Sequence, residues 1–163
     1  MPDLDPALID DIRAASRQMV REFGFMETTL AATNYPPSAV HTIIEIGLRG
    51  AMTAMQLAEF LHLEKSSVSR MIHKLIEAGE LMETMDPIDA RSKPLSLTAQ
   101  GRRTLARLHD FGWRQVLGAL GHLSYAEAQT VRDGLRLYAD ALTADRQASS
   151  SVETPRGGSW GRS

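Results

Sequence analysis

The chain has 163 residues, of which 43% are hydrophobic, and a formal net charge of −2. Its length and hydrophobic content suit one domain with its own core better than two domains. Cysteine is absent, which excludes disulfides and thiolate metal sites, and no stretch approaches the roughly 18 apolar residues of a membrane span. The acidic start lacks the basic and apolar regions of a secretory signal, so we expect a cytoplasmic protein without a membrane partner.

The first elements predicted along the chain are helices. Apolar residues recur at spacings of three and four from Leu8 to Leu30, which predicts one long amphipathic helix. The run Tyr35-Pro36-Pro37-Ser38 breaks that helix, because proline suits the first turn of a new one. The second helix then continues to Arg49-Gly50.

Two shorter helices follow, joined by a brief link. Thr53-x-x-Gln56 is a capping box, which predicts the start of the first of them. After the link 62–64, apolar residues from Val68 to Ile76 fall on one face of a second helix. Gly79 stands where a left-handed C-terminal cap is needed.

Beyond Gly79 the periodicity changes to that of strands. Leu81–Thr84 can form a strand, residues 86–92 are polar and rich in turn formers, and Lys93–Leu97 alternates apolar and polar side chains. Because Pro94 cannot donate to a strand ladder, we expect the second strand at an edge. The pattern predicts a β-hairpin with a polar tip.

Two more helices are predicted in the C-terminal part. Thr98 can cap the first, and Ser124-x-x-Glu127 is a capping box for the second. From about Gln147 the composition turns to Ser, Gly and Arg, which predicts a disordered tail over 147–163.

The predicted fold is therefore mainly α, a winged helix-turn-helix with a small β-hairpin wing. The domain spans residues 1–146, with its helix-turn-helix and wing over about 53–98. Flanking helices over about 6–33 and 98–146 are the expected dimerisation elements. This order places the second helix of the pair where it can enter the major groove of duplex DNA.

The free face of that second helix carries hydroxyl and basic side chains, which suit phosphates and base edges. Basic groups at a hairpin tip can reach the minor groove, and an aspartate there can hold the loop. A helix face of this kind is also typical of simple exposure to solvent, and an aspartate at this position is also typical of an ordinary turn. The predicted hairpin beside the helix is the feature that favours DNA binding. The candidate DNA-binding residues are Lys65, Ser66, Ser67, Ser69, Arg70, His73, Lys74, Asp89, Arg91 and Lys93.

These segments resemble a known family. Leu57–Leu61 and Ser67–Leu81 look like the helix-turn-helix of the MarR family, and Asp89-x-Arg91 with Leu95–Gly101 resembles its wing and the following helix. Ala90 stands where the family often has the first of two arginines, so Arg91, helped by Lys93, inherits the role at the tip.

The resemblance extends more loosely over about residues 8–146. It implies a ligand-responsive regulator that binds a palindromic operator in double-stranded DNA as a homodimer. Because repression is the usual role in the family, a repressor is expected. The apolar stripes of the flanking helices agree with dimerisation, although packing within one chain would also use them. The family further implies a small aromatic or phenolic effector held between the dimer helices and the DNA-binding lobe. Candidate pocket residues, which would also suit a core, are Phe23, Met26, Tyr35, His41, Phe111 and Trp113.

An enzyme is not expected. The five histidines form no His-x-x-x-His pair, so we expect no metal site. No P-loop or Gly-x-Gly-x-x-Gly occurs, so we expect neither a cofactor nor catalytic residues. Two alternatives stay open: a winged helix that contacts protein, and the regulator remnant of an acetyltransferase fusion without enzymatic activity, because the sequence is similar to the regulator part of such fusions.

Overall fold

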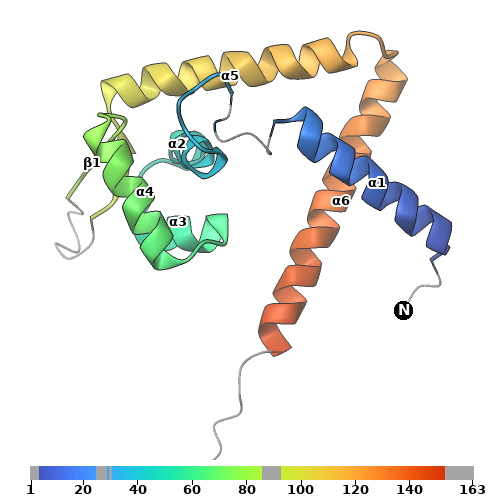
Figure 1. The fold of residues 1–163 in the computed structure, drawn as a ribbon, viewed down its shortest axis with the longest axis horizontal. Helices are drawn as coiled ribbons and strands as arrows, with labels where there is room; N and C mark the ends of the chain where they lie inside the picture. Colours follow the sequence, from blue (N-terminus) through green and yellow to red (C-terminus); the bar gives the residue numbers. More distant parts are fainter. Residues whose placement is uncertain (1–3, 25–28, 30, 86–92, 153–163) are drawn as a thin grey trace, which may run out of the picture. The chain divides into compact units, whose positions relative to one another are not determined.

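The computed structural model describes residues 4–24, 29, 31–85 and 93–152. The chain divides into two compact units, residues 1–115 and 116–163 (Figure 1). Within the described residues, no helix is long and apolar enough to cross a membrane. The elements are α1 (Pro6–Glu22), α2 (Pro37–Arg49), α3 (Ala54–Leu61), α4 (Lys65–Glu77), β1 (Leu81–Glu83), β2 (Leu95–Leu97), α5 (Ala99–Leu120) and α6 (Tyr125–Val152). The expected fold class, mainly α with a small β-hairpin, is confirmed.

The core of the first unit lies where α2, α3, α4 and the hairpin meet (Figure 1). Each of these elements contributes a side chain with at most 2% of its surface exposed: Ile43, Leu57, Val68, Leu75 and Leu81. Burying a side chain of this size contributes about 1.5–3 kcal/mol. This apolar cluster therefore fixes the packing of the helix-turn-helix.

The ends of the short helices follow the local signals in the sequence. The Gln56 amide donates to the Thr53 hydroxyl at 3.2 Å, and the Thr53 amide donates to the Gln56 side chain at 2.8 Å, so the predicted capping box is present. Gly79 lies just beyond α4 with φ at +75°, the left-handed conformation expected of it. These signals determine where α3 begins and α4 ends, because a few neighbouring residues satisfy the backbone hydrogen-bonding groups that are left unpaired at a helix end.

The hairpin pairs β1 with β2 in antiparallel register, Leu81 opposite Leu97. In the two-stranded sheet β2 lies at an edge, as expected, and outside the named strands Leu95 also exchanges two backbone hydrogen bonds with Met52, at 2.8 and 3.1 Å. Pro94 stands just before the strand, where its carbonyl accepts from the Thr84 amide at 2.7 Å. Its missing N–H ends the ladder there.

The predicted single helix from Leu8 to Leu30 is wrong at its C-terminal end. α1 ends at Glu22, and Gly24 follows with φ at +75°. Glycine adopts this conformation without steric cost, so it terminates the helix despite the continuing apolar spacing. Residues 25–28 and 30 lie outside the described residues.

The expected tail is wrong for residues 147–152, because α6 continues to Val152. The hydroxyls of Ser149 and Ser150 donate to the backbone carbonyls of Asp145 and Arg146, each at 3.0 Å. Serines that bond back onto the preceding turn are compatible with a helix, although their composition suggests a loop. Residues 153–163 lie outside the described residues.

The start of α5 packs closely on the chain segment that follows α4. A Cβ atom added to Gly101 would overlap the backbone carbonyl oxygen of Glu80. The Thr98 amide donates to that same oxygen at 3.0 Å, and the Gly101 amide donates to the Thr98 hydroxyl, also at 3.0 Å. Glycine at 101 is therefore required for the contact between α5 and the end of α4.

We predict that Gly101→Ala lowers the free energy of unfolding by about 1–3 kcal/mol, because backbone atoms must move apart to admit the methyl group. Gly112→Ala is the matched control in the same helix, where an added Cβ meets nothing within 4 Å. It should raise stability by about 0.5–1 kcal/mol, as alanine does in helix interiors. Urea unfolding of both variants checks this, and equal stabilities would contradict it.

Candidate nucleic-acid interface

Helix α4 has one buried face and one exposed face. Val68, Ile72 and Leu75 turn inward, and each exposes at most 8% of its surface. The apolar stripe predicted for this helix thus anchors it to the core. The opposite face is left free.

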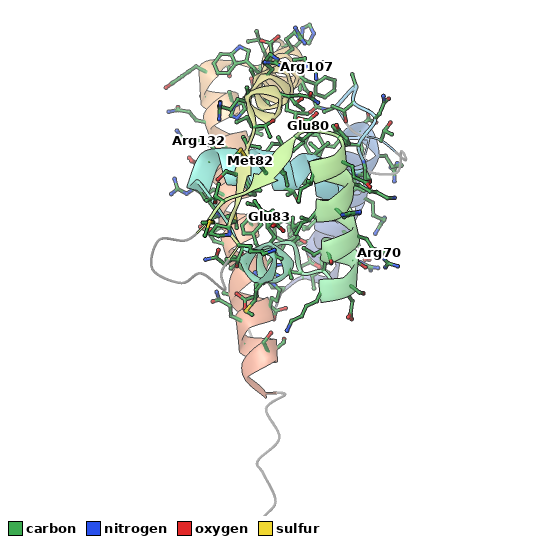
Figure 2. The ribbon with its side chains drawn as sticks, turned by 90° about the vertical axis from the view of Figure 1, so that its left-hand side faces the viewer. Arg70, Glu80, Met82, Glu83, Arg107 and Arg132 are labelled. Carbon is green, nitrogen blue, oxygen red and sulfur yellow. The ribbon has the colours of Figure 1, made fainter. Side chains whose placement is uncertain are left out.

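The free face brings together the seven candidate residues predicted on this helix. Ser67 is half-buried, and the Arg70 guanidinium donates to its hydroxyl at 3.4 Å. Figure 2 shows Arg70 projecting outward from α4. The other five are exposed: Lys65, Ser66, Ser69, His73 and Lys74. Hydroxyls and cations on one convex face can contact phosphates and base edges together.

A groove runs between α4 and the N-terminus of α2. Ser67, Arg70 and Lys74 line one wall, and Tyr35 and Ser38 line the other. The two basic side chains, Arg70 and Lys74, favour negative charge in this groove. The groove therefore extends the positive character of α4 toward α2.

The described part of the wing holds one internal ion pair. Lys93 Nζ lies 3.2 Å from Glu83 Oε2, and both side chains are largely exposed. A similar contact on α4 joins His73 Nε2 and Glu77 Oε1 at 3.2 Å, charged only when the histidine is protonated. Asp89 and Arg91 lie outside the described residues, so their role at the tip stays a prediction.

A buried carboxylate lies directly behind this interface, at Glu80, which is only 2% exposed. Its Oε1 accepts hydrogen bonds from the Tyr35 hydroxyl at 2.8 Å, the Thr104 hydroxyl at 3.1 Å and the Gln100 amide at 3.3 Å. Figure 2 shows Glu80 where α4 gives way to the strand, below Arg107 of α5. Burial, the hydrogen bond to Glu80 and that residue's charge raise the pKa of Tyr35 to about 12, against a lowering by Arg107.

This cluster was not predicted from the sequence. A glutamate directly after a C-terminal glycine is normally solvated. Its partners lie 45, 24 and 20 residues away along the chain. Strand alternation gives no signal for it, because Glu80 and the neighbouring strand residue Leu81 are both buried.

The candidate pocket residues separate into different places. Phe23, His41 and Phe111 line one apolar cavity of about 240 Å³ within the first unit, together with Ile44. Tyr35 instead lines a larger polar cavity with Arg107 and Asp110. Trp113 is 73% exposed and lines neither of the two cavities, and Met26 lies outside the described residues.

The described residues offer no metal chemistry. Over residues 4–24, 29, 31–85 and 93–152, no three His, Asp or Glu side chains gather as metal ligands would. What the geometry provides is a basic, hydroxyl-rich helix face beside a charged hairpin.

Comparison with known proteins agrees with this geometry. Residues 36–93 match the sequence model of the MarR family. No curated protein matches the chain by sequence.

Similar folds occur among solved structures. A probable transcriptional regulator from Pseudomonas aeruginosa aligns with a TM-score of 0.63 at 23% identity, over 80% of this chain and 98% of that one. BpsR from Bordetella bronchiseptica, whose DNA binding is regulated by 6-hydroxynicotinic acid, aligns at 0.62 and 18% identity, over 80% and 98%. The apo form of MarR from E. coli aligns at 0.64 and 17% identity, over 77% and 94%.

The fold is thus similar to those of these solved structures, and the resemblance noted in the sequence is confirmed over residues 36–93, which match the MarR family model and lie in a winged helix-turn-helix fold.

Proposed function

We propose that this chain is a transcription repressor that binds a palindromic operator in double-stranded DNA as a homodimer and responds to a small aromatic acid. The exposed hydroxyl and basic face of α4 carries the proposal, because it lies in a domain of a family of DNA-binding regulators. In this function Arg70 and Ser67 read base edges, while Lys65 and Lys74 contact phosphates. Arg91 reaches the minor groove from the wing.

The uncovered apolar surface of two helices supports dimerisation. α1 buries no residue in the single chain, yet Leu8, Ile9 and Ile12 lie on it. α6 likewise leaves Leu135 and Leu142 43% and 54% exposed. Amphipathic helices of this kind are stable when a partner covers their apolar face, and a second copy would cover both. A twofold dimer would present two α4 helices to two half-sites.

The apolar cavity supports a response to a small aromatic ligand. Its volume of about 240 Å³ accommodates one substituted ring, since a cavity of about 150 Å³ holds benzene. Phe23 and Phe111 provide apolar walls, and His41 provides a polar group. The regulation of BpsR by 6-hydroxynicotinic acid, a ring of this size, is consistent with the proposal.

The wing ion pair yields the first prediction of this function. Glu83→Gln should strengthen non-specific DNA binding by about 2–5-fold, because Lys93 is released to a phosphate and a negative charge is removed. The slope of log K against log salt should steepen by up to about one.

Fluorescence anisotropy with a labelled duplex at several salt concentrations measures both quantities. Asp140→Asn is the control, because it removes one exposed carboxylate on α6, outside the winged helix-turn-helix. If both variants bind equally, Lys93 is not a DNA contact.

The second prediction concerns sequence reading. Selection of duplexes from a random pool should enrich a palindrome whose half-sites are about one helical turn apart. Arg70→Ala should then weaken operator binding by about 1–3 kcal/mol and relax the preference at one base pair per half-site. Lys74→Ala should weaken all duplexes alike and flatten the salt slope by about one.

The selected duplex also serves to test release by aromatic acids. Failure to enrich any palindrome would overturn the operator proposal and favour a winged helix that contacts protein. Identical behaviour of the two variants would overturn the division between base-reading and phosphate-contacting residues.

A further inference from the structure

Glu80, the buried glutamate behind α4, is energetically unfavourable at its position. Moving a carboxylate out of water costs several kcal/mol, and the hydrogen bonds to Oε1 compensate only in part. Glu80 Oε2 is buried and has no hydrogen-bond partner among the described residues. A leucine there would add apolar burial without this cost. Stability alone therefore does not account for Glu80.

Hydrogen bonds supply something that apolar contacts lack, which is direction. Glu80 Oε1 joins three segments: Tyr35 lies just before α2, Gln100 and Thr104 lie on α5, and Glu80 itself follows α4. The cluster therefore fixes the angle of α4 against α2 and α5, whereas the apolar core alone would tolerate small rotations.

We propose that Tyr35 and Glu80 are positioning residues for DNA reading, and that the hydrogen bond between them holds α4 at the angle at which its outer face meets base edges. The inference rests on the proposed DNA binding. It assigns a part in sequence discrimination to the hydrogen bond between the Tyr35 hydroxyl and Glu80 Oε1.

A length estimate shows why the angle matters. α4 has 13 residues, and its length is therefore about 20 Å. A rotation of about 5° at its C-terminal end moves the N-terminal end by nearly 2 Å, while hydrogen bonds to base edges tolerate about 0.5 Å. Phosphate contacts from long, flexible side chains such as Lys74 adjust more easily. Specific binding should therefore suffer more than non-specific binding when the angle is lost.

Tyr35 also lies between two candidate binding surfaces. On one side it lines the groove with Arg70 and Lys74, and on the other it lines the polar cavity with Arg107. The segment before it is strained, since Ala31 and Ala32 have φ of +55° and +54°, which alanine rarely adopts. Such a conformation persists only where its surroundings hold it. Any displacement of this segment would be transmitted to α4 through Glu80.

Tyr35→Phe tests the proposal with the full chain and the operator found by selection. We expect specific affinity to fall about tenfold, with unchanged non-specific affinity and salt slope. Tyr125→Phe is the control, because that tyrosine is 80% exposed. A purely structural role would lower the melting temperature without changing the ratio of specific to non-specific affinity. That result would overturn the proposal.

Substitutions at Glu80 give an independent test. Glu80→Gln keeps a carbonyl oxygen that accepts from Tyr35, so it should retain most of the specific affinity, whereas Glu80→Leu should lose as much as Tyr35→Phe. The double variant Tyr35→Phe/Glu80→Leu should be no worse than either single variant, because one interaction is removed once. Additive losses, or a Gln variant as poor as Leu, would contradict a shared role.

A final prediction needs no DNA, so it separates failure of this inference from failure of the proposed function. In an ultraviolet titration of the full chain, the tyrosine with a pKa of about 12 should be missing in Tyr35→Phe. In Glu80→Gln its pKa should fall part of the way toward 10, because burial, the largest cause of the rise, remains while the charge that opposes ionisation is gone. Since the pKa of Tyr35 is raised by folding, the stability it contributes is complete below pH 10 and is lost as the pH rises from 10 to 12.

An unchanged transition near pH 12 in Glu80→Gln would overturn the hydrogen bond itself. A lowered transition combined with no enriched operator would leave the bond intact and reject the DNA-reading role together with the proposed function.

Discussion

The contact between α5 and the backbone of Glu80 is the constraint on which the winged helix-turn-helix depends. The Glu80 amide closes α4 by donating to the Leu75 carbonyl at 2.9 Å, and its carbonyl receives the Thr98 amide that begins α5. Gly101 permits this approach because it has no side chain. The end of one helix, the start of a strand and the start of another helix are thus joined within a few ångströms, and the orientation of each depends on the other two.

The two elements proposed to face DNA, α4 and the hairpin, both adjoin this junction. α4 ends at it, and β1 starts from it, with β2 held in turn between β1 and Met52. Arg70 and Lys93 therefore belong to one frame of short, rigid elements and not to independent loops. A fixed separation between a helix and a wing is what simultaneous contact with neighbouring grooves requires. The buried polar cluster around Glu80 Oε1 adds direction to a junction that apolar packing alone would leave adjustable.

The sequence predicted well whatever depends on neighbouring residues. Thr53 and Gln56 cap each other across one turn, and Gly79 ends a helix by its own conformational freedom, so both elements could be found by inspection. Long-range pairing could not be predicted from the sequence. Met52 pairs with Leu95, more than forty residues away, and no local pattern near either residue indicates this pairing. Glu80 was missed for the same reason. The face of α4 could be predicted because its periodicity is local, whereas the cluster that orients it depends on the tertiary fold.

The net charge of −2 does not oppose a role in binding nucleic acid. At physiological ionic strength the Debye length is about 8 Å, so a phosphate at the α4 surface responds to the side chains beside it far more than to distant carboxylates. What matters is the local balance of charge, and there Glu83 lies beside Lys93, while Glu77 lies beside His73, which is charged only when protonated. In the proposed function, such pairs would weaken non-specific binding to any duplex, while the hydroxyls of Ser66 and Ser69 would remain able to make directed contacts. A moderately charged face that is held at a fixed angle favours discrimination between sequences over tight binding to all of them.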